Sequence, residues 1–239
     1  MRGPGRRSQF AAACLGVVVA ASTGSNAADD LMQRSRAMYA TLRSYADTGV
    51  VVHEFGASAT DQFKFTTRFN RAPRHFYLEL EGGRYVIWAD PSAFHTWWRD
   101  TGQQTDYRNP NNSPAITQSG QQARGVNDKI PTLLYSSATL GGSFVNFSDR
   151  VVDGTEMVSG HACQRISGTA RDVYGATGRE SNVRKMTVWI DLESLLIRKV
   201  LEEWKPLPGQ RSRMTTLYEP QANPTIDESR YRFTPPTPR

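Results

Sequence analysis

Large apolar residues alternate with polar ones along much of this chain, and this period of two constrains the fold most. Phe63, Phe65 and Phe69 alternate with polar side chains, and Phe76 and Leu78 repeat the pattern one segment later. Successive side chains of a strand point to opposite faces, so these rings gather on one face of a sheet. A glycine turn at residues 81–83 separates this segment from another at 85–89, which predicts a hairpin.

The same pattern continues without helices between the strands. Further strands are predicted at residues 50–55, 93–99, 144–152, 156–159, 162–169, 184–191, 196–204 and 214–219. Turn residues separate these segments, which indicates an antiparallel meander and argues against a parallel βαβ fold.

Two helices are predicted. Residues 28–45 carry Leu31, Met38 and Leu42 at helical spacing, and residues 128–140 carry Leu133 and Leu134 before a pair of glycines. The sequence therefore predicts a mainly β, α+β fold with one domain over residues 28–239.

The first 27 residues have the composition of a cleaved signal peptide. Arginines precede an apolar run at residues 10–21, and small residues lead to a cleavage site after Ala27. The run is shorter than the roughly 20 residues of a membrane span, so we expect no transmembrane anchor and a periplasmic location. Acylation of Cys14 is the alternative.

Charge argues against nucleic acid as a partner. Loss of the three arginines of residues 1–27 lowers the formal charge from +6 to +3, and basic residues form no long run.

Motifs of the common extracytoplasmic enzymes are absent. There is no Gly-x-Ser-x-Gly, His-Glu-x-x-His or Ser-x-x-Lys, and His53, His75, His95 and His161 stand apart in the sequence. Cys163 has no second mature cysteine to pair with. We therefore expect no catalytic, metal or cofactor site, with a hydrolase of unrecognised type as the less favoured alternative.

The density of aromatic residues in the first β half predicts an apolar ligand. Large rings on one face of a curved sheet, with only two helices to cover it, would leave a concave surface suited to an acyl chain.

Four short segments, in this order, resemble the LolA-like family of periplasmic lipoprotein carriers and related outer-membrane lipoprotein-sorting proteins. They are residues 42–45, 69–76, the hairpin at 188–200 and 233–236. The resemblance covers nearly the whole mature chain. It implies a curved, incomplete antiparallel barrel covered by helices, with lipid or lipoprotein acyl chains in the space between.

Carried over by position, the resemblance predicts both the cavity and its lid. The lid residues would be Leu31, Met38, Leu42, Leu133 and Leu134. The cavity would be lined by Phe63, Phe65, Phe69, Phe76, Leu78, Ile87, Trp88 and Trp97.

In the carriers an arginine directly before a proline holds the lid by hydrogen bonds. Arg71 is the nearest match here, although Ala72 separates it from Pro73, and Arg74 is the alternative. The resemblance thus favours a binder or carrier of lipid or lipidated protein, and the alternative is an envelope sensor that binds a protein partner on the same scaffold.

Overall fold

The computed structural model describes residues 23–56, 59–89, 93–107, 129–135, 144, 146–174, 179–204 and 211–236. The predicted signal peptide lies almost entirely outside this part of the chain, as do residues 136–140 of the second predicted helix.

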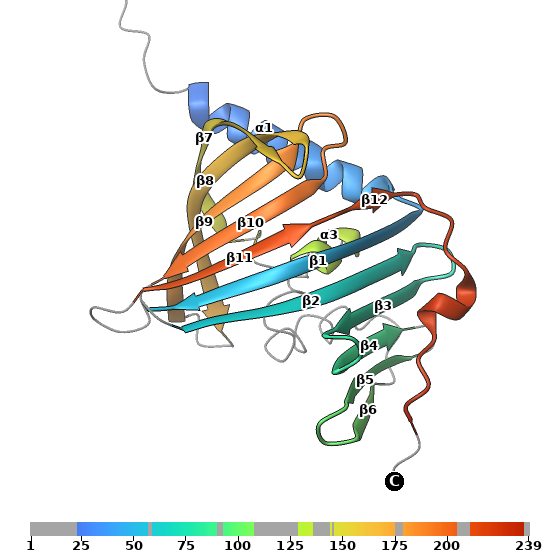
Figure 1. Cartoon of the computed structure of the whole chain (residues 1–239). Coiled ribbons are helices and arrows are strands. Elements are labelled where there is room, and N and C mark those ends of the chain that lie inside the picture. Colours follow the sequence, from blue (N-terminus) through green and yellow to red (C-terminus); the bar gives the residue numbers. More distant parts are fainter. Residues whose placement is uncertain are drawn as a thin grey trace, which may run out of the picture.

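The described residues form two helices, one 3-10 turn and one large sheet (Figure 1). The helical elements are α1 (Thr23–Thr41), α3 (Ile130–Leu134) and η2 (Glu228–Tyr231). The strands of the first half are β1 (Ser44–Phe55), β2 (Ala59–Asn70), β3 (His75–Leu80), β4 (Tyr85–Ala89), β5 (Phe94–Trp98) and β6 (Gln103–Tyr107). Those of the second half are β7 (Phe147–Val158), β8 (His161–Tyr174), β9 (Arg179–Asp191), β10 (Ile197–Trp204), β11 (Ser212–Tyr218) and β12 (Gln221–Ala222).

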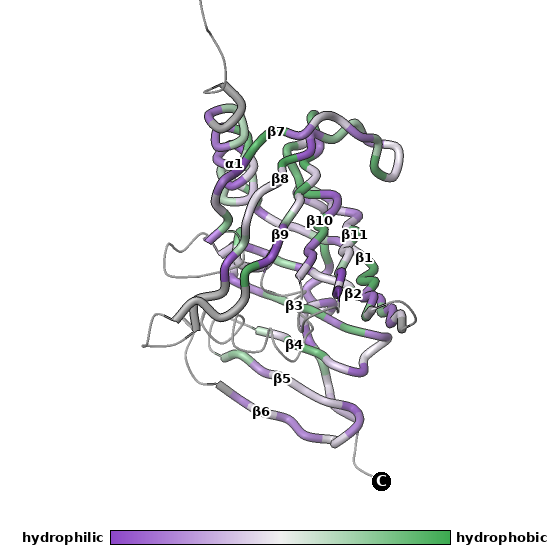
Figure 2. The backbone as a smooth tube through the Cα atoms, turned by 90° about the vertical axis from the view of Figure 1, so that its left-hand side faces the viewer, coloured by the Kyte–Doolittle hydropathy of each residue, from purple (hydrophilic) through white to green (hydrophobic). Residues whose placement is uncertain are grey.

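The sheet has twelve strands and is antiparallel throughout, in the order β6-β5-β4-β3-β2-β1-β11-β10-β9-β8-β7, with β12 beside β1. It curves around the side on which α1 and α3 lie (Figure 1). The predicted fold class, an open curved antiparallel sheet with helices on one side, is confirmed. Figure 2 shows hydrophobic and hydrophilic positions following one another along the strands, as the period of two predicts.

The boundary between α1 and β1 was predicted wrongly. The expected helix reached Tyr45 and the next strand was expected at residues 50–55, whereas α1 ends at Thr41 and β1 already begins at Ser44. Tyr45 pairs with Phe69 of β2 and with Ala222 of β12, so hydrogen bonding to two neighbouring strands overrides the helical spacing.

One long strand replaces two that were predicted at residues 144–152 and 156–159. β7 runs through both, and its pairing with β8 shifts register twice. Asp149 and Gly154 lie in this strand with positive φ values of 53° and 92°. Such bulges interrupt the alternation, which explains why the sequence pattern suggested a break.

Gly49 lies on the concave face of β1, at a point where its neighbours leave no room for a side chain. It pairs with Phe65 of β2 and with Tyr218 of β11. A Cβ atom at this position would overlap the Phe65 ring and the carbonyl oxygen of Leu217. The missing side chain therefore makes room for a ring that belongs to the core.

A second, smaller apolar cluster lies on the opposite face of β3, β4 and β5. Tyr77, Val86 and Trp97 pack there against Tyr231 and Phe233 of the C-terminal segment. This segment follows β12 and descends along the edge of the sheet to β3–β6 (Figure 1). No helix among the described residues is long and apolar enough to span a bilayer.

Candidate functional site

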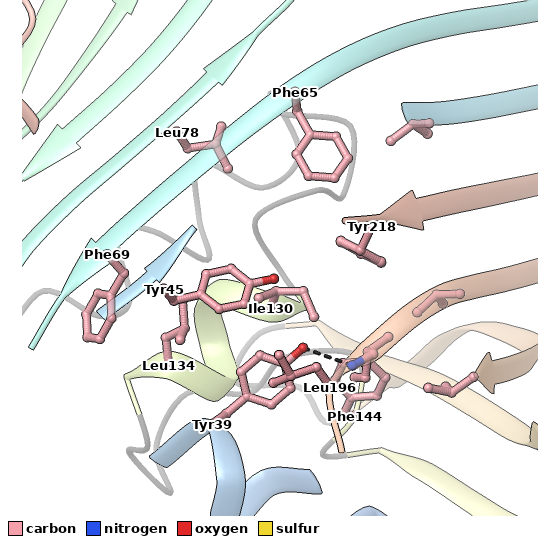
Figure 3. Packing of buried hydrophobic residues seen from close by; sticks show 14 of the residues in the cluster. Tyr39, Tyr45, Phe65, Phe69, Leu78, Ile130, Leu134, Phe144, Leu196 and Tyr218 are labelled. Carbon is pink, nitrogen blue, oxygen red and sulfur yellow. Dashed lines mark hydrogen bonds between the residues drawn. The ribbon is translucent and has the colours of Figure 1, made fainter. Parts of the chain in front are cut away.

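The concave face of the sheet and the two helices enclose one large apolar cluster. Six of the predicted lining residues are buried in it, and all five predicted lid residues are buried in it or packed against it. The sheet contributes Phe63, Phe65, Phe69, Phe76, Leu78 and Ile87, and the lid side contributes Leu31, Met38, Leu42, Leu133 and Leu134. Figure 3 shows side chains from both sides meeting in this interior. We refer to this cluster as the lid interior.

Trp88 and Trp97 do not belong to the lid interior, so this part of the prediction is wrong. Both lie in the cluster on the opposite face, where the ring of Phe233 is 5.2 Å from Trp88 and 5.0 Å from Trp97. Ile87 and Trp88 are adjacent in β4 and must point to opposite faces. The neighbouring residue Trp98 is the one that packs against the lid interior.

Polar contacts near its ends and in its middle hold α1 over the sheet. Asp29 Oδ1 is 2.7 Å from Arg150 Nε of β7, and the guanidinium of Arg36 donates to the carbonyl oxygen of Phe144 at 2.9 Å. Farther along the helix, the phenol oxygen of Tyr39 accepts a hydrogen bond from the backbone N–H of Ile197 at 3.1 Å (Figure 3). These few contacts fix the helix relative to β7 and β10.

Arg71 holds the C-terminal end of α1. Its Nε donates to the carbonyl oxygen of Leu42 at 2.7 Å, and its Nη2 donates to that of Tyr39 at 2.9 Å. Carbonyl groups at a helix C-terminus have no partner within the helix, and a guanidinium fork is suited to two of them at once. Arg74, the alternative, lies instead over the ring of Tyr135 at 5.9 Å.

A buried ion cluster holds α3, and sequence reasoning missed it. Lys129, directly before α3, is 1% exposed, and its Nζ lies 2.8 Å from Oε2 of Glu202, which is 2% exposed. Arg184 Nε lies 3.0 Å from the other oxygen of the same carboxylate. Because Lys129 and the α3 segment are far in sequence from the β9–β10 hairpin, no local pattern could reveal this cluster.

Asp47 places a second polar group in the lid interior. It is 3% exposed on the concave face of β1, and its Oδ2 accepts a hydrogen bond from the phenol of Tyr45 at 2.7 Å. Burial raises the pKa of Asp47 to about 6, although hydrogen bonds from Tyr45 and Thr67 act in the opposite direction.

Asp47 should make the free energy of unfolding fall as the pH rises from acid to neutral. The folded-state pKa of about 6 lies above the ordinary value of 3.8, so the unfolded chain releases its proton first as the pH rises. This one group should therefore lower the free energy of unfolding by about 2 to 3 kcal/mol between pH 3.5 and pH 7.5. Urea denaturation of the wild type and of Asp47→Asn at both pH values measures it, and the variant should gain relative to the wild type at the higher pH. An equal stability difference at the two pH values would contradict this prediction.

His95, His161 and His75 lie in different parts of the sheet, and Cys163 lies near His161, to whose backbone carbonyl its thiol donates at 3.5 Å. His95 lies 2.7 Å from Asp106, His161 lies 3.1 Å from Asp191, and the ring of His75 packs near Tyr231. Burial, and next the charge of Asp191, raise the pKa of the Cys163 thiol to about 11, which keeps it protonated near neutral pH. Among the described residues no three His, Cys, Asp or Glu side chains are grouped as metal ligands would be.

No family model matches the sequence, and no curated protein matches it. Solved structures do match. MucB has 13% identity and a TM-score of 0.52, over 88% of this chain and 64% of MucB. Lipoprotein LppX of Mycobacterium tuberculosis has 13% identity and a TM-score of 0.47, over 84% of this chain and 98% of that protein. A LolA superfamily protein of Nitrosomonas europaea has 8% identity and a TM-score of 0.38, over 86% of this chain and 97% of that protein.

These comparisons bear on the fold. The chain spans about two thirds of the length of MucB, whose likeness is the strongest of the three by TM-score. Together with the curved sheet and its helical cover, the match to MucB shows that the chain shares the fold of that protein.

Proposed function

We propose that this protein is an exported binder or carrier of lipid or lipidated protein, and that it takes the acyl chains into the lid interior. The observation that carries the proposal is the contrast between the two sides of that interior. The sheet offers a mostly apolar face, whereas its cover within the described residues is one helix and one short turn of helix that pack against this face and are held by a few polar contacts. A cover attached in this way can lift without breaking the sheet.

In the proposed mechanism Arg71 acts as the latch. In the closed form its guanidinium bonds the carbonyl oxygens of Tyr39 and Leu42 at the end of α1. An entering acyl chain would separate α1 from the phenylalanines of β2, and the same separation would break both hydrogen bonds. Ligand binding and lid opening are then coupled, because the ligand binds only the open form.

Two measurements on the purified protein test this function. Native mass spectrometry should show co-purified lipid, and an uncharged apolar dye such as Nile red should bind and be displaced by fatty acyl compounds. The proposal fails if the protein carries no lipid and Nile red does not bind.

Arg71→Met should favour the open form of the lid. The two latch bonds exist only in the closed form, so their loss, offset by solvation of the freed carbonyls, should destabilise the closed form by about 1.4 kcal/mol. Because Nile red would bind the open form, this corresponds to about tenfold tighter binding of the dye, which fluorescence titration measures. Arg74→Met is the matched control, because Arg74 lies over the ring of Tyr135 and makes no hydrogen bond to α1 within the described part of the chain, and it should leave the affinity unchanged. Equal effects of the two variants would remove Arg71 from the latch role.

A protein partner is the second candidate, and the edge strand β7 favours it. β7 ends the sheet order and exposes Val151 and Met157, which are 49% and 63% accessible. An exposed edge with apolar side chains can accept a further strand from a partner. A pull-down that recovers one envelope protein, and loses it with Met157→Lys, would support this function over lipid carriage.

A further inference from the structure

Asp47 occupies a position in which an ionised carboxylate is energetically unfavourable. Thr67 lies opposite it on β2, with Phe65 and Phe69 on either side of Thr67, and Leu78 follows on β3. All three of these apolar side chains are buried in the lid interior. Transfer of an ionised group into such surroundings is strongly unfavourable unless hydrogen-bond partners or opposite charges compensate it. The partners of the Asp47 carboxylate must therefore be accounted for.

The partners within the fold compensate Asp47 only in part. Tyr45 donates to Oδ2 and Thr67 also hydrogen-bonds the carboxylate, whereas Oδ1 makes no hydrogen bond of ordinary length and angle with the described residues. No Lys, Arg or His of the described part of the chain forms an ion pair with Asp47. The carboxylate thus has acceptor capacity left over.

Asp47 also lies beneath the latched end of the lid. The ring of Tyr39, on α1, packs 5.7 Å from the ring of Tyr45, and both hydroxyl groups point into the interior (Figure 3). The backbone carbonyl of the same Tyr39 is one of the two that Arg71 binds. Release of Arg71 would therefore remove one of the two hydrogen bonds that hold Tyr39 next to the Tyr45–Asp47 pair, the other being that from Ile197.

We propose that Asp47, with Tyr45 and Thr67, is a headgroup site for an amphipathic ligand whose polar end donates hydrogen bonds, a primary ammonium being the strongest match. This inference rests on the proposed function and adds the chemistry of the ligand. A carboxylate oxygen beside two hydroxyl groups accepts from a donor and attracts a cation, while an anionic headgroup would be repelled in the same low-dielectric interior. The pKa of about 6 keeps Asp47 largely ionised at pH 8, where the test is made.

Three probes of equal chain length separate charge from hydrogen bonding. Dodecylamine supplies a cation with donors, dodecyltrimethylammonium a cation without donors, and dodecanoate an anion. Each displaces Nile red at pH 8 from the wild type, from Asp47→Asn and from the control Asp153→Asn, whose carboxylate lies exposed on β7. Urea denaturation of each variant confirms that it is folded, and the near-isosteric change at Asp47 removes a buried charge and should not unfold the chain.

The wild type and the control should bind dodecylamine about tenfold more tightly than dodecyltrimethylammonium, with dodecanoate weakest. In Asp47→Asn the ratio between the two cations should fall to about one. Two outcomes would refute the headgroup site and leave the carrier function standing, provided that Nile red binds. One is an affinity ratio of about one between the two cations in the wild type, and the other is a ratio in Asp47→Asn that equals that of the wild type. If neither Nile red nor any probe binds, the carrier function and the headgroup site fall together.

Discussion

Glu202→Gln should destabilise the protein by about 4 kcal/mol, measured as the loss in the free energy of unfolding by urea denaturation. Glu202 is the shared carboxylate between Lys129 and Arg184; Lys129 and Glu202 are buried, and the side chain of Arg184 is 13% exposed. Removal of its charge leaves two cations beside each other in the interior. Breaking a buried pair in this way costs more than the pair contributes, because the remaining charges stay desolvated.

The next residue along β10 supplies the matched control for this change. Glu203 is exposed, and Glu203→Gln should change stability by less than about 0.5 kcal/mol. The double variant Lys129→Met/Glu202→Gln should recover part of the loss, since it removes one uncompensated cation together with its partner. Similar losses for the two single glutamine variants would show that Glu202 is not the centre of a buried cluster.

Gly49→Val should lower the free energy of unfolding by about 3 kcal/mol or more, because the new side chain would overlap atoms already packed at this point of the concave face. The new side chain would overlap the Phe65 ring, which can move only into its own core neighbours, and the carbonyl oxygen of Leu217, which belongs to the β11 backbone. Thermal or urea denaturation measures the loss. Thr48→Val, on the exposed face of the same strand, places a valine in β1 without this overlap and should change the free energy of unfolding by less than about 0.5 kcal/mol. A mild effect of valine at both positions would contradict the close approach.

The strands and the concave face were predictable because both follow from local alternation. Phe63, Phe65 and Phe69 share a face by the geometry of a strand alone, and the hairpin turns carry their own glycine signals. Errors arose where pairing partners or bulges decided the outcome, as at Tyr45 and along β7.

The polar groups of the lid interior were not predictable in the same way. Lys129 and Glu202 meet only because α3 is placed on β10, and Asp47 resembles a turn residue until its strand is paired on both sides. Alternate residues of a strand face opposite sides of the sheet, so the predicted face of Trp88 and Trp97 depended on which residues of the strand were assigned to the concave side. An error of one residue moves a side chain to the other side of the sheet.

The pairing of β1 with β11 has a consequence for how the chain folds. Strands β1 to β6 form one run of neighbours and β7 to β10 another, and each run can form from contacts that are close in sequence. The pairings of β1 with β11 and with β12 join the two runs across most of the chain length. Closing so long a loop is slow, so we expect this seam to form late and to limit the folding rate.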